Sequence, residues 1–218
     1  MNKTNKMNKI NNSQIIDNIL LKYDINEKYS DKINEFLEFL LKKNLELNLM
    51  SRKLSVSDII YDHFEDCLSA HKYFTEYDSI ADIGTGGGLP GILLAIIFED
   101  KRVELYDKSP KKADYLKEAI NTLNLKNAAL FCGTVSSFEI KTSVATCRAF
   151  KPIAEIIDHT KRYFDNRRAY LLYKGRREVV DEEIKTALKS NNFIYNVYKI
   201  DSENRERNIV FLQKSNKK

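Results

Sequence analysis

Five of the seven glycines in this 218-residue chain lie within the ten-residue segment 82–91, DIGTGGGLPG. Glycine adopts backbone conformations that other residues avoid and lets a ligand approach the main chain closely, so this density indicates a ligand-binding turn. Ligands of open α/β sheets bind beyond the carboxyl ends of the strands, most often at the loop after the first strand. Pro90 suits the first turn of a helix, where its missing N–H costs no hydrogen bond. The segment therefore predicts a nucleotide-type cofactor site between a strand and a helix.

Two acidic residues help to choose between the cofactors that such a loop could hold. Gly86, Gly88 and Gly91 satisfy the G-x-G-x-x-G fingerprint of dinucleotide sites, which keeps an NAD-dependent dehydrogenase open as an alternative. Asp82 is expected at the mouth of the loop, where a carboxylate would repel a pyrophosphate but attract the ammonium and sulfonium of S-adenosylmethionine. Asp107 ends the next predicted strand and could accept hydrogen bonds from both ribose hydroxyls of either cofactor. On this basis we favour S-adenosylmethionine.

The elements that must position this loop alternate along the chain from residue 77 onward. Short apolar runs typical of strands are separated by helical patterns, which indicates βαβ units and a mostly parallel sheet. The last two strands have no helix between them and predict an antiparallel C-terminal edge. The fold class is therefore α/β, with a doubly wound, seven-stranded, Rossmann-like sheet of the methyltransferase type. The expected strands are 79–84, 102–107, 128–133, 143–150, 169–175, 193–200 and 207–214.

The chain before this sheet divides into two parts. Residues 1–12 are rich in Asn and Lys and hold almost nothing that could be buried, so they are expected to form a disordered basic tail. Residues 13–76 show only helical spacing of their apolar side chains and predict a helical cap. Residues 77–218 form the predicted class I methyltransferase domain.

Composition excludes several other classes of protein. The chain is 43% hydrophobic and 31% charged, which is a globular composition. No apolar run approaches the ~20 residues that span a bilayer, and the N-terminus has no secretory signal, so we expect no membrane partner. Three scattered cysteines fit a reduced, cytoplasmic protein. Residues 148–177 carry nine basic and three acidic side chains, which suits a polyanionic partner.

Several further motifs, in order, make the chain resemble one family from about residue 30 to the C-terminus. With the loop DIGTGGGLPG, they resemble the bacterial ribosomal small-subunit methyltransferase G family, also called glucose-inhibited division protein B. The resemblance implies methylation of guanine N7 in the 530-loop region of 16S rRNA, with S-adenosylmethionine as donor and S-adenosylhomocysteine as product. The implied partner is 16S rRNA or the small ribosomal subunit, with no protein partner; another S-adenosylmethionine-dependent RNA methyltransferase is the alternative. The motifs are Asn44-x3-Asn48-Leu49, His63-x2-Asp66, Arg148-Ala149-Phe150, Tyr173-Lys174-Gly175 and Glu206-Arg207.

The resemblance also assigns residues to the cofactor site. Val135 and Ser136 would lie beside the adenine, and Arg148 would close the site at the end of the fourth strand. Ser136 departs from the acidic residue that the family usually has, and Met50 departs from its threonine. The full predicted cofactor-binding set is Asp82, Gly84, Gly86, Gly88, Leu89, Asp107, Val135, Ser136 and Arg148.

The chemistry of the implied reaction needs positioning rather than proton transfer, because guanine N7 has a free lone pair at neutral pH. We therefore assign no catalytic acid or base, and Arg148 and Lys174 are the candidates for positioning. Arg148 could hold a phosphate or base edge and Phe150 could stack a base; alternatively, Arg148 is in an ion pair and Phe150 is in the core. The predicted RNA-binding residues are Arg148, Phe150, Lys174 and Arg207.

Two other chemistries are disfavoured by local sequence. Cys147 could attack a pyrimidine base, but such cysteines usually follow proline, whereas Thr146 precedes this one. His63, Cys67 and His71 have helical spacing, and the first and last would lie ~12 Å apart, too far for one zinc ion. We therefore expect a buried, inert thiol and no metal site.

Overall fold

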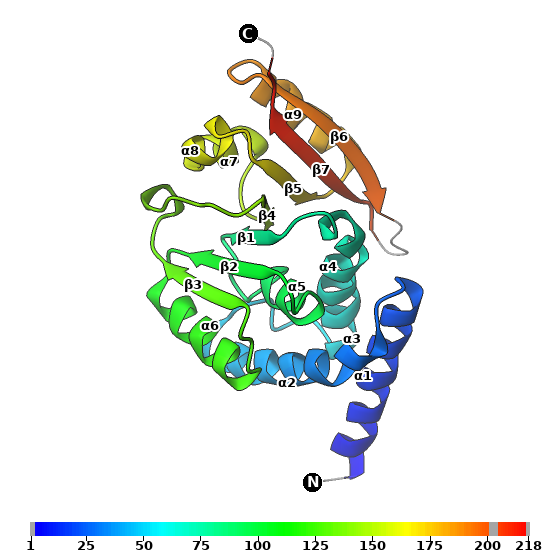
Figure 1. Ribbon diagram of the computed structural model, residues 1–218. Coiled ribbons are helices and arrows are strands. Elements are labelled where there is room, and N and C mark those ends of the chain that lie inside the picture. The colour runs from blue at the N-terminus through cyan, green and yellow to red at the C-terminus, as the bar shows by residue number, and fades with distance from the viewer. Residues whose placement is uncertain (1–2, 201–204, 217–218) are drawn as a thin grey trace.

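A seven-stranded sheet forms the centre of the protein, in the strand order β3-β2-β1-β4-β5-β7-β6 (Figure 1). The computed structural model describes residues 3–200 and 205–216. Strands β1 to β5 run parallel, and β7 pairs antiparallel with both β5 and β6. This confirms the predicted fold class, including the antiparallel edge. The strands are β1 (Ser79–Ile83), β2 (Arg102–Asp107), β3 (Ala128–Cys132), β4 (Val144–Arg148), β5 (Ala169–Lys174), β6 (Phe193–Ile200) and β7 (Arg207–Lys214).

The parallel register brings the chemistry-bearing residues to one edge of the sheet. Asp82 pairs with Leu105 of β2 and Thr146 of β4, so the three central strands end close together. Asp107 is the last residue of β2, and Arg148 is the last residue of β4. The glycine loop leaves β1 between these two strand ends, which is where open α/β sheets bind ligands.

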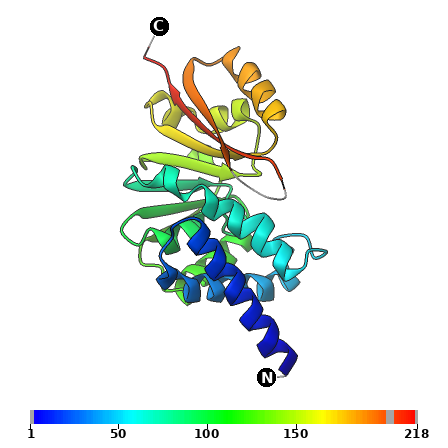
Figure 2. The same ribbon diagram turned by 90° about the vertical axis from the view of Figure 1, so that its right-hand side faces the viewer.

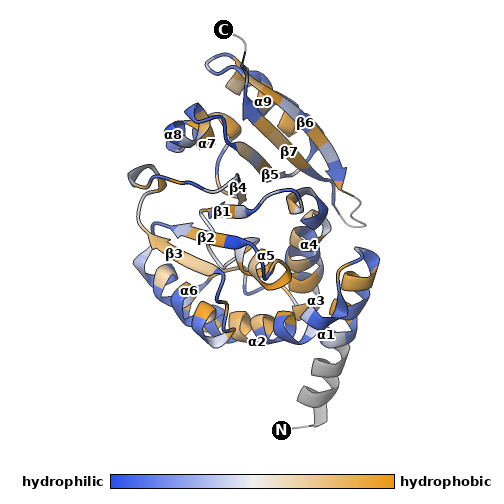
Figure 3. Ribbon diagram, viewed as in Figure 1, coloured by the Kyte–Doolittle hydropathy of each residue, from blue (hydrophilic) through white to orange (hydrophobic). Residues whose placement is uncertain are grey.

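Helices cover both faces of the sheet and explain why its central strands are almost continuously apolar. Alternate residues of β1 point to opposite sides: Ile80 packs in one core with α5, α6 and the cap, while Ala81 and Ile83 pack in a second core with α7, α8 and α9. All seven residues of α5 are buried, and the helix is hydrophobic along its whole length in Figure 3. These helices are α5 (Gly91–Ile97), α6 (Pro110–Thr122), α7 (Ile153–His159), α8 (Lys161–Asp165) and α9 (Arg177–Leu188), with the short 3-10 turn η4 (Val135–Ser137) after β3.

The N-terminal cap is helical, as predicted, and packs beside α5 and α6 (Figure 2). Its α2 buries one stripe of side chains: Ile33, Phe36, Leu37 and Leu40. The backbone helix α1 begins at Lys3, in place of the disordered tail expected over residues 3–12, because that segment holds no proline or glycine to stop a helix anchored further along. Residues 1–2 lie outside the described part of the chain. The cap comprises α1 (Lys3–Lys22), η1 (Glu27–Tyr29), α2 (Ser30–Leu47), α3 (Val56–Ile59), η2 (Ile60–Glu65), α4 (Asp66–Ser69) and η3 (His71–Phe74).

Two helical segments are interrupted. In the cap, a π-helical turn, η2, lies between α3 and α4, and such turns often occur at functional sites. After β4, α7 ends at His159, and the non-helical backbone of Thr160 separates it from α8. Within the described residues, no helix is long and apolar enough to span a bilayer.

Substituting Gly91 tests how closely α5 must approach the sheet. A Cβ at this position would collide with Leu105 Cδ2 and lie 2.7 Å from the carboxylate Oδ2 of Asp82. We expect Gly91→Ala to lower the free energy of unfolding by about 1–3 kcal/mol, because a buried strand would have to shift. Urea unfolding followed by circular dichroism measures this change.

Gly175→Ala is the matched control, because no atom lies within 4 Å of the Cβ it would add. Its free energy of unfolding should stay within about 0.5 kcal/mol of the wild-type value. Equal losses in the two variants would show that close packing at Gly91 is not what limits substitution.

Candidate functional site

The glycine loop is held by hydrogen bonds to its own backbone and to β2. The N–H groups of Gly84 and Thr85 both donate to the carbonyl of Tyr106, at 2.8 and 3.0 Å. Gly84, Gly86 and Gly88 have φ angles of +70°, +59° and +87°, which side chains with a Cβ rarely adopt. The predicted tight turn is therefore present, and three of its glycines are required by backbone conformation.

A tyrosine that sequence reasoning missed also supports this loop. The Tyr115 hydroxyl, from the buried face of α6, donates to the carbonyl of Gly87 at 3.0 Å. In the sequence Tyr115 is one member of an apolar helical stripe, and nothing in that pattern distinguishes it from an ordinary core residue. Its role depends on how α6 packs against the loop.

Asp107 occupies the position expected of a ribose-binding acid. Its carboxylate is buried and accepts N–H groups from Gly86 at 3.0 Å and from Ser109 at 2.9 Å, one on each oxygen. Each carboxylate oxygen can accept a second hydrogen bond. Asp107 is thus fixed by the backbone and retains acceptor capacity for two hydroxyl groups.

Asp82 lies below the loop, and the prediction that it stands at the loop's mouth is wrong. Its side chain is completely buried, and its Oδ2 accepts the Gly91 N–H at 2.8 Å. Burial raises the pKa of this carboxyl to about 6. Its Oδ1 and the Thr85 hydroxyl have no hydrogen-bond partner among the described residues. The strand alternation that places Ile80 toward α5 also turns Asp82 inward, so it supports the loop from beneath.

The residues predicted to lie beside the adenine flank a small hollow. Val135 is buried and Ser136 is exposed within η4, and both line a cavity of about 150 Å³. Phe138 and His159 line the same cavity. Leu89, at the end of the glycine loop, is 7% exposed. The assignment of Val135, Ser136 and Leu89 to cofactor binding stays a prediction.

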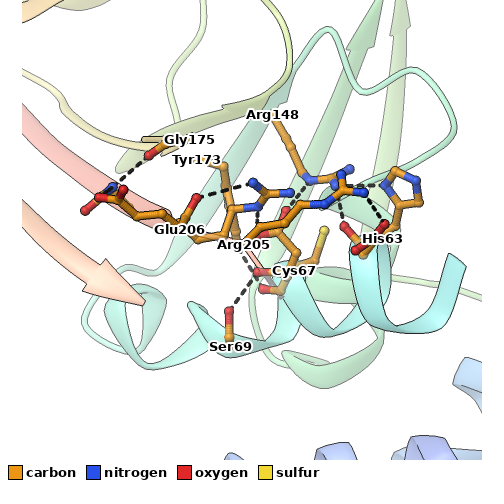
Figure 4. A network of polar contacts seen from close by, with 12 residues as sticks. His63, Cys67, Ser69, Arg148, Tyr173, Gly175, Arg205 and Glu206 are labelled. Carbon is orange, nitrogen blue, oxygen red and sulfur yellow. Dashed lines mark hydrogen bonds and ion pairs between the residues drawn. The ribbon is translucent and has the colours of Figure 1, made fainter. Parts of the chain in front are cut away.

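Arg148 is held in one orientation by the cap. Its Nε donates to Asp66 Oδ2 at 2.7 Å, and its Nη2 donates to the Asp62 carbonyl at 2.9 Å and to His63 Nδ1 at 2.8 Å. In Figure 4 the Arg148 side chain reaches from the end of β4 to the cap helix that carries His63. His63 and Asp66, both in the cap, therefore bind the same arginine side chain.

Asp66 also binds a second arginine, which the sequence did not predict. Its Oδ1 accepts from Arg207 Nε at 3.1 Å, so one carboxylate joins the end of β4 to the start of β7. The side chain of Asp66 is 8% exposed, against 15% for Arg148 and 21% for Arg207. The only sequence signal for this bridge was that the three residues belong to motifs of the same family.

Phe150 packs directly on the glycine loop. A Cβ at Gly84 would lie 2.8 Å from Phe150 Cε2, so this glycine is required by the ring as well as by its φ angle. Ala149, with φ +51°, turns the chain sharply after β4 and brings Phe150 back over the loop. Phe150 is half-buried and packs against the second core, and its use in base stacking stays a prediction.

A cavity of about 400 Å³ brings the four predicted RNA-binding residues together, and its lining also includes Asp66 and Glu183. Three of the four carry a positive charge, and each already has a carboxylate partner. Lys174 Nζ lies 2.7 Å from Glu183 Oε2 and also donates to the carbonyl of Lys151. The role of these residues in RNA binding stays a prediction. The four residues are Arg148, Phe150, Lys174 and Arg207.

The two buried cysteines, Cys67 and Cys147, are unsuited to nucleophilic attack. Burial raises the pKa of the Cys147 thiol to about 12, so it is protonated at neutral pH, as the predicted inert thiol requires. Cys67 is likewise buried, and burial raises its pKa strongly. His71 bonds to the Leu68 carbonyl. No group of three or more potential metal ligands lies together in the described part of the chain.

The arrangement combines a backbone cradle, an acid at the end of β2 and an arginine at the end of β4. A nucleoside could bind its ribose to Asp107 while its remaining part lies along the loop.

Comparison with known proteins gives the family. Residues 29–210 match the model of the family described as rRNA small subunit methyltransferase G. The ribosomal RNA small subunit methyltransferase G of Brachyspira hyodysenteriae is 34% identical over 206 residues, which cover 93% of this chain and all of that protein. Ribosomal RNA small subunit methyltransferase G 1 of Bdellovibrio bacteriovorus is 36% identical over 78% of this chain and 82% of its own length.

Two solved structures with a similar fold were determined in complex with S-adenosylmethionine or with SAH. An O-methyltransferase from Bacillus cereus in complex with SAH has a TM-score of 0.55 and 14% identity, over 83% of this chain and 91% of that one. A mutant of MtNAS in complex with S-adenosylmethionine has a TM-score of 0.57 and 19% identity, over 89% and 80% of the two chains. At these identities the likeness shows the fold alone.

Removing the bridging carboxylate tests whether the cap depends on it. We expect Asp66→Ala to lower the free energy of unfolding by about 3 kcal/mol, because two partly buried arginines lose their shared counter-charge. Asp165→Ala is the control: this exposed aspartate pairs with Lys161 and Lys214, and its removal should cost less than about 1 kcal/mol. Urea unfolding measures both, and equal losses would contradict a special role for Asp66.

The pH dependence of stability tests the state of His63. Burial, with the nearby Arg148 guanidinium, lowers the pKa of His63 from 6.5 to about 4, so the neutral ring accepts the arginine hydrogen bond. The unfolded chain therefore binds more protons than the folded chain between these values, and stability should fall as pH falls from 6.5 to 4. The measurement is urea unfolding of the wild type and His63→Gln at several pH values.

Contributions to the pH dependence of stability from groups present in both proteins cancel in this comparison. One such group is Asp82, whose raised pKa makes stability fall as pH rises. The stability of the wild type relative to His63→Gln should decline with falling pH. A constant difference across this range would show that His63 titrates normally.

Proposed function

The chain belongs to the rRNA small subunit methyltransferase G family, and from this premise we propose how its crevice performs the family's reaction. The protein is an S-adenosylmethionine-dependent 16S rRNA methyltransferase that acts on guanine N7. The dehydrogenase alternative is not favoured by any of these relatives.

The crevice has the features that S-adenosylmethionine requires. The cofactor needs acceptors for two ribose hydroxyls, which Asp107 can supply, and close access to backbone atoms, which Gly84, Gly86 and Gly88 allow. It carries no phosphate, so the acids beneath and beside the loop do not oppose it. The residues proposed to hold it are Gly84, Gly86, Gly88, Leu89, Asp107, Val135 and Ser136, with Asp82 supporting the loop through Gly91.

The bound cofactor supplies an activated methyl group, and the protein's task is to place guanine N7 in line with it. The N7 lone pair is available at neutral pH, so no side chain has to remove a proton first. We propose that Phe150, which lies on the glycine loop, provides an apolar surface for the base. Because the Phe150 ring also covers Gly84, it helps to exclude water from the reacting atoms.

Arg148 is proposed as the positioning residue of the base. The three acceptors that fix it leave its Nη1 without a hydrogen bond to any described residue, so one edge of the guanidinium can still donate. A rigid arginine orients a base edge at little cost in side-chain entropy. The observation that carries the proposal is that Arg148, Phe150 and the glycine loop meet at one edge of the sheet, beside Asp107.

The substrate is proposed to be the 530-loop region of 16S rRNA, presented as free RNA or within the small ribosomal subunit. A cytoplasmic location would match this substrate. Neither assignment depends on a particular oligomeric state.

The test is transfer of labelled methyl from S-adenosylmethionine to unmodified 16S rRNA and to unmodified small subunits, followed by nucleoside analysis. We expect the label in 7-methylguanosine. Cys147→Ala should keep its kcat within about threefold of wild type, because the mechanism uses no thiolate.

Label in 5-methylcytidine, lost in Cys147→Ala, would instead establish cysteine chemistry. Calorimetry with S-adenosylhomocysteine and with NAD provides the binding control. Absence of transfer from protein that binds S-adenosylhomocysteine would overturn the proposed substrate while leaving the cofactor assignment intact.

A further inference from the structure

Three lysines lie on the α6 side of the cofactor loop. Lys108, Lys111 and Lys112 follow Asp107 within five residues that contain no acid. Lys108 and Lys111 are exposed, and Lys112 is partly buried. Lys112 Nζ lies 3.9 Å from the position that a Cβ on Gly86 would occupy, so its charge stands directly beside the loop.

These lysines have no partner in the parts of the chain that the structure describes. No hydrogen bond or ion pair joins any of their Nζ atoms to another described residue. By contrast, Lys43 on the neighbouring α2 pairs with Glu118 of α6 at 2.6 Å. The three charges are therefore available to an external anion.

The cations on the other side of the loop are less available. Arg148 and Arg207 share Asp66, and Lys174 pairs with Glu183. Turning Lys174 toward a phosphate would leave Glu183 without its counter-charge, and turning both arginines would do the same to the buried Asp66, which is costly. Their geometry suits local positioning of a base better than attraction of a polyanion.

The cap adds positive charge next to the same loop. Leu49, after α2, lies 3.7 Å from the position of a Cβ on Gly87, so the segment 48–54 borders the loop. This segment contains Arg52 and Lys53 and no acid. Both are exposed, and within the described chain the Arg52 guanidinium donates only to the Leu45 carbonyl.

We propose that Lys108, Lys111 and Lys112 form an RNA-phosphate surface that holds the substrate strand across the cofactor crevice. The inference rests on the proposed function and deepens it by assigning the phosphate contacts to Lys108 and the first turn of α6 rather than to Lys174 and Arg207. Lysine ammonium groups bind phosphates as point charges and release counterions from the nucleic acid. The paired cations then contact the target base, and the unpaired lysines supply most of the attraction for the strand.

The test compares Lys108→Gln/Lys111→Gln/Lys112→Gln with a matched triple variant, Lys117→Gln/Lys126→Gln/Lys189→Gln. The control removes the same charge from exposed lysines further from the loop, in α6 and after α6 and α9. The measurement is kcat/KM for methylation of unmodified 16S rRNA or small subunits at several salt concentrations.

We expect the loop-side triple variant to lose about tenfold or more in kcat/KM at 0.15 M salt, with the loss concentrated in KM for RNA. The slope of log kcat/KM against log salt should become shallower by roughly 2, since each lost phosphate contact contributes about 0.7–0.9. Affinity for S-adenosylhomocysteine should change less than twofold. The control variant should retain both its rate and its salt slope.

Three results would overturn the inference. Equal losses in the control would show a general effect of net charge. A matching loss of S-adenosylhomocysteine affinity would place the lysines in the cofactor site, and an unchanged rate and salt slope would show that RNA does not contact them. Absence of methylation by the wild type would instead count against the proposed function, so the two failures are distinguishable.

Discussion

The Asp66 carboxylate is the contact on which the arrangement of cap and sheet most depends. It comes from the cap, whereas both of its arginine partners come from the sheet, at the end of β4 and the start of β7. Moving the cap away would separate one carboxylate from two cations, all of them mostly shielded from water. The Tyr173 hydroxyl adds a second tie from β5 to the Cys67 carbonyl, one residue along the chain. Since Arg148 belongs to the proposed site, any shift of the cap would also change the geometry of the site.

The glycine loop obeys a different constraint, which is steric. Phe150 covers one glycine and Asp82 lies under the start of α5, so the loop is confined from both sides. Side chains at Gly84 or Gly91 would displace these neighbours. The conformation is further fixed by the Tyr106 carbonyl and the Tyr115 hydroxyl. A cofactor therefore meets a surface whose shape is set before binding, which reduces the entropy lost on association.

The sequence predicted the fold well because each strand and helix carries its own local signal. The alternating segments from residue 77 onward, and the absence of a helix between the last two strands, indicated the parallel sheet and its antiparallel edge. The sequence also predicted the glycine loop and Asp107, because the loop follows β1 directly and Asp107 ends β2, so the local strand signals locate both. It misplaced Asp82, since the face toward which a strand residue points depends on packing against α5. It also missed the sharing of Asp66 by two arginines, because that contact joins residues 82 and 141 positions apart.

The same long-range pairing explains why charge counted along the chain is a weak guide to where RNA binds. Residues 148–177 form a strongly basic stretch of the sequence, yet the cations of that stretch that line the crevice are paired with acids from α4, α7 and α9; these cations are Arg148, Lys151 and Lys174. The shorter cluster after Asp107 contributes fewer charges, but it has no described carboxylate within ion-pair distance. Attraction of a polyanion depends on the charge left after internal pairing. In this fold, the ion-paired cations hold the crevice rigid. The unpaired lysines at its rim provide the positive electrostatic field that attracts a nucleic acid.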